Sequence, residues 1–170
     1  MAKKQRLDKA IAMQGSLSRS EVKTLIRKGA VTVNGQVVKN ADFGVDFDSD
    51  TVAVQGKELS LSMHIYLMLN KPKGVVSASE DKKLPTVVDL VPKELWRKGL
   101  FPAGRLDKDT TGFVLITDDG EFAHDILSPK KHISKTYHAL VNGTITDEMV
   151  EGFAKGVTIG EDFTLPASLK

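Results

Sequence analysis

The strand-like runs of this chain are short, and helical patterns fall between them without the regular spacing of βαβ units. The clearest turn signal is Asn34-Gly35, which separates Val31-Thr32-Val33 from Gln36-Val37-Val38. Both turn residues tolerate a positive φ, so the pair predicts a tight antiparallel hairpin. We therefore expect an α+β fold with a mixed, mostly antiparallel sheet and not a doubly wound one.

The first 60 residues predict a small α/β module. Leu7 and Ile11 lie four residues apart and predict a short helix over residues 6–13. Ser18 and Glu21 have the spacing of a capping box, which predicts a second helix that ends before Gly29. The hairpin follows, and residues 51–54 predict a further strand.

Positive charge is concentrated at the N-terminus. Residues 1–40 hold nine Lys and Arg against two acidic residues, although the net charge of the whole chain is only +2. Arg19, Lys23 and Arg27 recur every four residues, so they lie along one side of the second helix. This basic stripe indicates either a polyanionic partner or an ordinary solvated helix face.

Several N-terminal motifs together resemble a known RNA-binding module. They are Arg6-Leu7-Asp8, Ser18-Arg19-Ser20-Glu21, Ile26-Arg27-Lys28-Gly29 and Val31-Thr32-Val33-Asn34-Gly35. The resemblance is to the small module shared by one ribosomal protein, tyrosyl-tRNA synthetases and rRNA-modifying enzymes. It implies that residues 1–60 bind RNA backbone through five basic side chains: Arg6, Arg19, Lys23, Arg27 and Lys28.

The remainder, residues 61–170, predicts a second domain after a short linker at residues 59–63. Residues 65–69 predict a buried strand that ends in Lys71-Pro72-Lys73-Gly74, a tight loop presenting two lysines. We also expect a helix at 121–127, a strand at 135–141 and a helix capped by Thr146. Trp96 and Phe101 are expected in the core.

A polar loop bracketed by glycines, Gly104 to Gly112, precedes the apolar run of residues 113–116 and contains Asp107. Asp107 could be a turn or capping residue. Together with Asp109 it could hold Mg²⁺, or the two could act as a glycosidase carboxylate pair. The residues of the loop alone leave these alternatives open.

Five motifs in order resemble the bacterial rRNA pseudouridine synthases of the small-subunit (RsuA) type. They are Lys71-Pro72-Lys73-Gly74, Pro85-Thr86-Val87-Val88-Asp89-Leu90, Gly104-Arg105-Leu106-Asp107-Lys108-Asp109-Thr110-Thr111-Gly112, Thr117-Asp118-Asp119-Gly120 and Ser134-Lys135-Thr136-Tyr137. The run Ser128-Pro129-Lys130-Lys131-His132 most resembles the small-subunit member.

That resemblance implies that residues 61–170 form the N-terminal part of a catalytic domain that isomerises uridine to pseudouridine in 16S rRNA. It implies that Asp107 is the essential carboxylate, that Arg105 holds the helix open around a flipped nucleotide, and that Tyr137 stacks on the target base. Lys71 and Lys73 are expected as phosphate contacts. Neither a cofactor nor a metal ion is expected.

Three further expectations concern the whole protein. No motif after Leu140 matches the family's later strand with its basic partner for the aspartate, so we expect the domain to continue beyond Lys170, and a chain ending there could be inactive. The rival functions are an RNA-binding or ribosome-assembly factor with an inactive synthase-like domain, and a large-subunit synthase. The sequence has no cysteine and no membrane-length apolar run, so we expect a cytoplasmic monomer whose partner is small-subunit rRNA or its assembly intermediate.

Overall fold

The computed structural model describes residues 4–15, 17–131 and 133–170, and the N-terminal hairpin forms as the Asn-Gly pair predicts. β2 (Val31–Val33) pairs antiparallel with β3 (Gln36–Val37). Asn34 and Gly35 have φ values of 51° and 77°, the left-handed conformation of a two-residue hairpin turn. β2 also pairs with β5 (Val52–Val54), which pairs with β6 (Lys57–Leu59), so the strand order is β3-β2-β5-β6.

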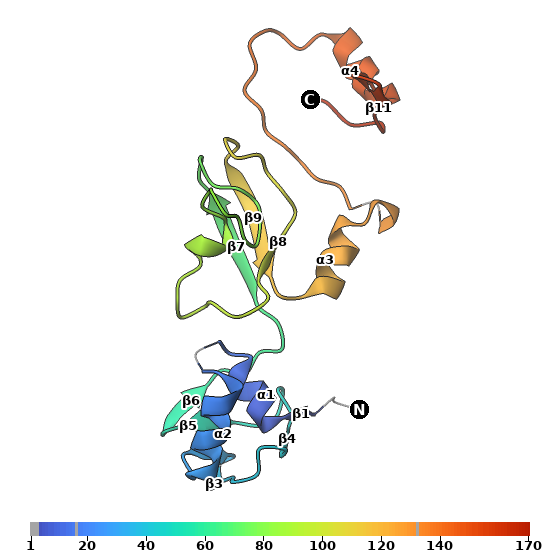
Figure 1. Cartoon of the computed structure of the whole chain (residues 1–170). Helices are drawn as coiled ribbons and strands as arrows, with labels where there is room; N and C mark the ends of the chain where they lie inside the picture. The colour runs from blue at the N-terminus through green and yellow to red at the C-terminus, as the bar shows by residue number, and fades with distance from the viewer. Residues whose placement is uncertain (1–3, 16, 132) are drawn as a thin grey trace. The chain divides into compact units, whose positions relative to one another are not determined.

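Two helices accompany this sheet, α1 (Leu7–Ala12) and α2 (Arg19–Arg27), and they lie side by side in Figure 1. The predicted capping box is confirmed, because Ser18 and Glu21 each accept a hydrogen bond from the other's backbone N–H. The short strands β1 (Gln5–Arg6) and β4 (Gly44–Val45) pair antiparallel beside α1.

The apolar faces of these elements meet in one core. Its buried members are Leu7, Ile11, Val22, Ile26, Val31, Val33, Val45, Val52 and Val54. These are the apolar positions that face inward at helical spacing in α1 and α2 and at alternate positions in β2 and β5, which explains why the local sequence pattern was informative here.

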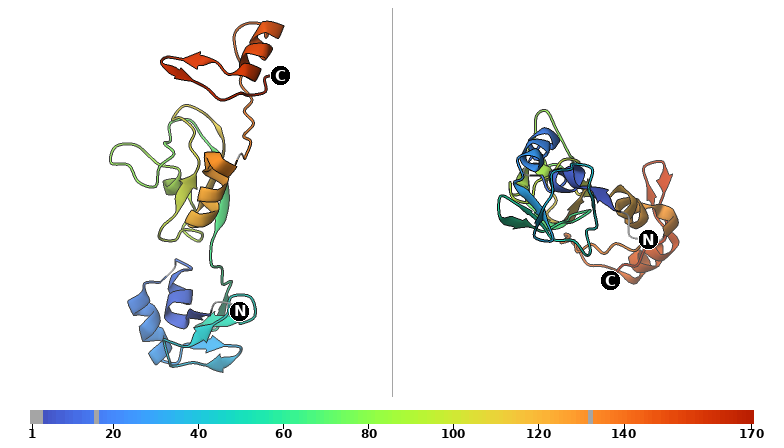
Figure 2. Two further views of the ribbon diagram at one scale, coloured as in Figure 1. Left: turned by 90° about the vertical axis from the view of Figure 1, so that its right-hand side faces the viewer. Right: turned by 90° about the horizontal axis from the view of Figure 1, so that it is seen from below.

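A second sheet carries the glycine-bracketed loop. β9 (Gly112–Thr117) lies between β7 (Tyr66–Lys71) and β8 (Phe101–Ala103), and both pairings are antiparallel. α3 (Gly120–Leu127) follows β9 directly and packs beside β8, as the turned view in Figure 2 shows.

The opposite side of this sheet is closed by a second core. Its buried members are Val75, Val87, Val88, Leu100, Val114 and Ile116. The quoted motif Pro85 to Leu90 contains a 3-10 turn, η1 (Val88–Leu90), and a second such turn, η2 (Pro129–Lys131), follows α3. His132, part of the basic run noted above, lies outside the described residues.

The linker between the two sheets is held by polar contacts. Gln14 exchanges two hydrogen bonds with the backbone of Ser62, both 3.3 Å, and accepts a third from Arg97. Arg97 is buried and also donates to the carbonyl of Ser62 and to Asp118. The expectation that Trp96 is buried was wrong: it is 46% exposed, and its neighbour Arg97 occupies the interior because carbonyl and carboxylate acceptors satisfy its guanidinium there.

By contact, the chain divides into two compact units, residues 1–133 and 134–170. The second contains α4 (Asp147–Lys155), capped by Thr146 as predicted, and the hairpin of β10 (Thr158–Ile159) and β11 (Asp162–Phe163). Gly156 joins the helix to the hairpin with a φ of 97°, and a Cβ there would lie 2.4 Å from the carbonyl oxygen of Thr164.

The strand predicted at residues 135–141 is not formed. No described residue pairs with this segment, and Leu140 is 98% exposed. High β-propensity produces a strand only where a neighbouring strand offers hydrogen-bond partners. The α+β class with antiparallel sheets is nevertheless confirmed, and no helix in the described part of the chain is long and apolar enough to cross a membrane.

Candidate active site and nucleic-acid interface

The loop that carries Asp107 connects two paired strands, β8 and β9. The backbone N–H of Thr110 donates to the carbonyl of Asp107 at 3.0 Å, so residues 107–110 form a turn at its tip. The Asp107 side chain is exposed to solvent. The backbone of Asp107 therefore takes part in a turn, as one of the alternatives predicted. Its carboxylate makes no hydrogen bond within the described residues and is accessible to a ligand.

Lys71, the last residue of β7, holds this turn through its side-chain ammonium group. Its ammonium nitrogen lies 3.0 Å from the carbonyl oxygen of Lys108, 2.8 Å from that of Thr110 and 3.1 Å from that of Pro72. An ammonium has three N–H donors, so each is matched by one acceptor. Lys71 is 0% exposed, which places it inside the protein and out of reach of the phosphate contact expected for it.

Two further residues, Ser77 and Gly74, hold the loop through three hydrogen bonds. The Ser77 hydroxyl donates to the carbonyl of Leu106 at 2.8 Å and lies 3.0 Å from the backbone nitrogen of the same residue. The backbone N–H of Gly74 donates to the carbonyl of Lys108 at 2.9 Å. The residues on both sides of Asp107 are thus tied to the Lys71-to-Ser77 segment.

The other predicted site residues lie in different surroundings. Arg105 and Lys73 are exposed beside the anchored loop, where they are free to meet a ligand. Tyr137 is 69% exposed and belongs to the second unit, residues 134–170. Asp109 is exposed, and no group of three or more His, Asp or Glu side chains within the described ranges could hold a metal, so the magnesium alternative gains no third ligand.

The basic surface of the N-terminal module is built around a carboxylate. Asp8 is 0% exposed and accepts two hydrogen bonds of 3.1 Å from Arg6. Arg19 approaches it at 3.3 Å and Lys23 at 3.8 Å. Arg6 also pairs with the exposed Asp42.

Electrostatics keep Asp8 ionised in this position. Burial raises the pKa of its carboxyl, but the hydrogen bonds from Arg6 and the charge of Arg19 outweigh burial, so the pKa lies below its usual value. The same contacts raise the pKa of Arg6. Arg27, the last residue of α2, and its C-cap Lys28 are both exposed, so only part of the predicted stripe converges on Asp8.

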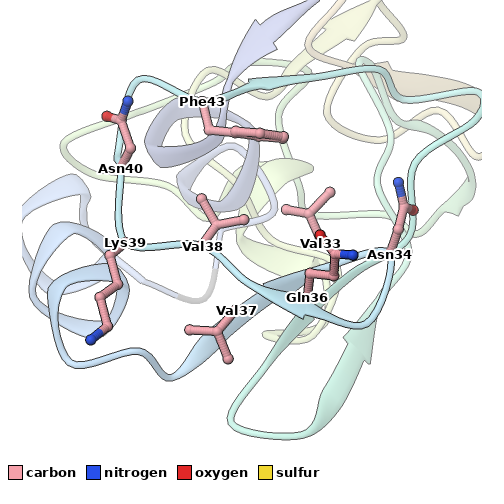
Figure 3. Close-up of a pocket in the computed structure, with 8 residues that line it drawn as sticks. All are labelled: Val33, Asn34, Gln36, Val37, Val38, Lys39, Asn40 and Phe43. Atoms are coloured by element: carbon pink, nitrogen blue, oxygen red, sulfur yellow. The ribbon is translucent and has the colours of Figure 1, made fainter.

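Sequence reasoning missed Asp8 and the role of Lys71. Both stand inside motifs that were quoted, yet side-chain spacing along the chain does not reveal which charged group is buried. A third feature was also missed: a groove of about 550 Å³ lies along the hairpin of β2 and β3 (Figure 3). It is lined by Val33, Asn34, Gln36, Val37, Val38, Lys39, Asn40 and Phe43, and includes neither Asp107 nor the cations around Asp8.

Comparison with known proteins matches both halves of the chain to families. The RNA pseudouridylate synthase family matches residues 65–161, and the S4 domain matches residues 5–52. The RNA pseudouridine synthase YtzG of Bacillus subtilis is 48% identical over 91% of this chain, which spans only 64% of that protein.

Two further relatives differ in the ribosomal subunit that their names give. The ribosomal small subunit pseudouridine synthase A of Escherichia coli is 44% identical over 97% of this chain and 72% of its own length. The ribosomal large subunit pseudouridine synthase B of Bacillus subtilis is 40% identical over 98% of this chain and 67% of its own length.

Proposed function

Because this chain belongs to the RNA pseudouridylate synthase family, we propose that the protein converts a specific uridine of 16S rRNA to pseudouridine, with Asp107 as the essential carboxylate. Residues 1–60 would hold the RNA, and residues 61–170 would form the N-terminal part of the synthase domain. The proposed setting is the cytoplasm, with a monomer acting on small-subunit rRNA or an assembly particle.

The reaction is an isomerisation and balances without a co-reactant. The bond between C1′ of the ribose and N1 of uracil breaks, the base turns, and a bond forms between C1′ and C5. The C5 proton is lost and N1 gains a proton, so nothing is oxidised or reduced. Asp107 acts as a nucleophile toward ribose or base, or as a base toward ribose.

The observation that carries this proposal is the anchoring of an exposed carboxylate. The Asp107 side chain faces solvent, while the backbone around it is tied to Lys71, Gly74 and Ser77 by bonds of 2.8–3.0 Å. A reacting group must be held within a fraction of an ångström of its working position, which rigid loop ends provide. An aspartate that served only as a turn residue would not need this degree of support.

In this proposal the other exposed site residues have complementary tasks. Arg105 occupies the space left in the RNA helix by the flipped nucleotide and contacts phosphate, because extrusion of a base costs a few kcal/mol that a planar cation can offset. Lys73 contacts phosphate, and Tyr137 stacks on the extruded uracil. Lys71 acts as a positioning residue for the loop.

The subunit assignment is tested with unmodified transcripts. The protein is incubated with small-subunit and with large-subunit rRNA, each as free RNA and as an assembly particle, in the presence and absence of EDTA. We expect pseudouridine at a single position of the small-subunit RNA and undiminished activity with EDTA. Modification confined to the large-subunit RNA would replace the 16S assignment by the second candidate function, a large-subunit rRNA pseudouridine synthase. The large-subunit relative at 40% identity supports this second candidate.

The remaining alternative is an RNA-binding or ribosome-assembly factor with an inactive synthase domain. It predicts RNA binding without modification of any of these substrates. The presence of Arg105, Asp107 and Tyr137 together speaks against it.

A further inference from the structure

Three cations from different parts of the N-terminal module converge on a single buried carboxylate. Arg6 comes from the end of β1, and Arg19 and Lys23 come from successive turns of α2. Their nitrogens lie 3.1, 3.3 and 3.8 Å from Oδ2 of Asp8. Like charges this close repel one another, so their convergence depends on the negative charge between them.

The buried carboxylate leaves some N–H groups of the three cations without a hydrogen bond to it. Arg6 uses Nε and one terminal nitrogen on Asp8, and Arg19 uses only one terminal nitrogen. The three side chains remain 49%, 54% and 41% exposed, so N–H donors are left over toward solvent. The three cations and the buried Asp8 together carry a net charge of +2, and the exposed Asp42 that pairs with Arg6 lowers it to +1.

We propose that Asp8 is a positioning residue for RNA: it assembles Arg6, Arg19 and Lys23 into one receptor for a backbone phosphate. The inference rests on the proposed RNA-binding function and adds that the carboxylate of Asp8 positions the cations of the RNA-binding surface. A receptor whose cations are already gathered binds an anion without the loss of freedom that three separate long side chains would incur. A phosphodiester suits the receptor, because arginine binds phosphate through paired N–H donors.

Asp42 provides a matched control for the charge of Asp8. It also pairs with Arg6, but its side chain is 64% exposed, and no ion pair joins it to Arg19 or Lys23 among the residues that the structure describes. Asp8→Asn and Asp42→Asn each remove one negative charge from the same region. If charge alone decided affinity, both variants would bind RNA more tightly than the wild-type protein.

The experiment measures binding of a fluorescein-labelled RNA stem-loop to the full chain by fluorescence anisotropy over a range of salt concentrations. We expect Asp8→Asn to raise Kd about tenfold and to reduce the slope of log K against log salt, because fewer cations then engage phosphate together. Asp42→Asn should bind at least as tightly as the wild-type protein. A loss of stability alone would leave the salt slope of the folded fraction unchanged.

Equal affinity and equal salt slope for the two variants would overturn the positioning role. If the wild-type protein itself binds no RNA, the proposed function of the module fails, and the inference falls with it. The two failures are therefore distinguished by the wild-type titration.

A second measurement decides the matter if Asp8→Asn does not fold. In the isotopically labelled wild-type protein, the Arg6 Nε–H should exchange slowly with solvent, since it donates to the buried carboxylate. The Arg6 and Arg19 side-chain resonances should shift when the RNA stem-loop is added. Exchange at Arg6 as fast as at the exposed Arg27, or no response to RNA, would overturn the proposal.

Discussion

A lysine can be fully buried only where its charge and its three donors are satisfied, and Lys71 meets that condition with three backbone carbonyls. Two of these carbonyls belong to the turn that follows Asp107. The energy that stabilises the buried ammonium therefore also fixes the loop that presents the carboxylate.

We predict that Lys71→Met lowers the free energy of unfolding by about 3 kcal/mol, because it leaves buried carbonyls without donors. Pseudouridine formation should fall by more than RNA affinity does, since the loop and not the RNA surface is disturbed. Lys73→Met is the control, because Lys73 lies two residues away and is exposed. Urea unfolding of both variants measures the effect, and equal stability of the two would contradict the anchoring role.

For single residues, the sequence could identify candidates for the site but could not predict what each of them does. Lys71 and Lys73 were both expected at phosphate, yet only the tertiary structure separates a buried strand end from an exposed loop. Asp107 could be located because glycines bracket its loop and family motifs surround it. Asp8 could not, because its three partners are set by how β1 and α2 meet.

At the scale of elements, α3 is attached to β7 through its N-cap. Asp119 accepts a hydrogen bond from the backbone N–H of Phe122 at 3.0 Å and another from the Tyr66 hydroxyl at 2.6 Å. The rings of Tyr66 and Phe122 meet edge to face with centroids 5.1 Å apart. These contacts orient the helix that follows the central strand.

We predict that Tyr66 titrates abnormally. Its hydrogen bond to Asp119 raises the pKa of Tyr66 to about 12, and the same bond, together with that from Phe122, lowers the pKa of Asp119. The hydrogen bond of Tyr66 therefore stabilises the folded protein fully below the pKa of 10.0 that an unfolded tyrosine has, and this stabilisation is lost as the pH rises through about 12. The contribution of Asp119 is present above 3.8 and is lost as the pH falls further.

Absorbance of the phenolate in a Tyr137→Phe variant isolates Tyr66, because the chain has only two tyrosines. We expect the titration to move toward the ordinary tyrosine value when Asp119→Asn is added. An unchanged titration would show that the hydrogen bond does not control the ionisation of Tyr66.

Elements defined by local chemistry were predicted well, and those defined by distant partners were not. The capping box at Ser18, the Asn34-Gly35 turn and the cap at Thr146 each depend on residues within a few positions. Residues 135–141 have the composition of a strand, but strand formation requires a partner edge that composition does not supply. Trp96 was assigned to the core by residue type, although its neighbour Arg97 makes the buried contacts.

At the scale of the whole molecule, charge and chemistry are separated along the chain. The N-terminal 40 residues carry an excess of seven positive charges, whereas residues 41–170 carry a net charge of −5. Long-range attraction of RNA is therefore concentrated on the module that surrounds Asp8, and the Asp107 loop can present a carboxylate near a polyanion that is held elsewhere. This division explains how the proposed action on RNA is compatible with a net charge of only +2.

The central claim is that Asp107 is the reacting carboxylate, and the most direct measurement compares Asp107→Asn with Asp109→Asn on rRNA. Both are exposed aspartates of one loop, so either change should cost at most about 1 kcal/mol of stability. Asp107→Asn should abolish pseudouridine formation and leave RNA affinity equal or higher, whereas Asp109→Asn should retain most of the activity. Pseudouridine formation by Asp107→Asn at the wild-type rate would contradict the account.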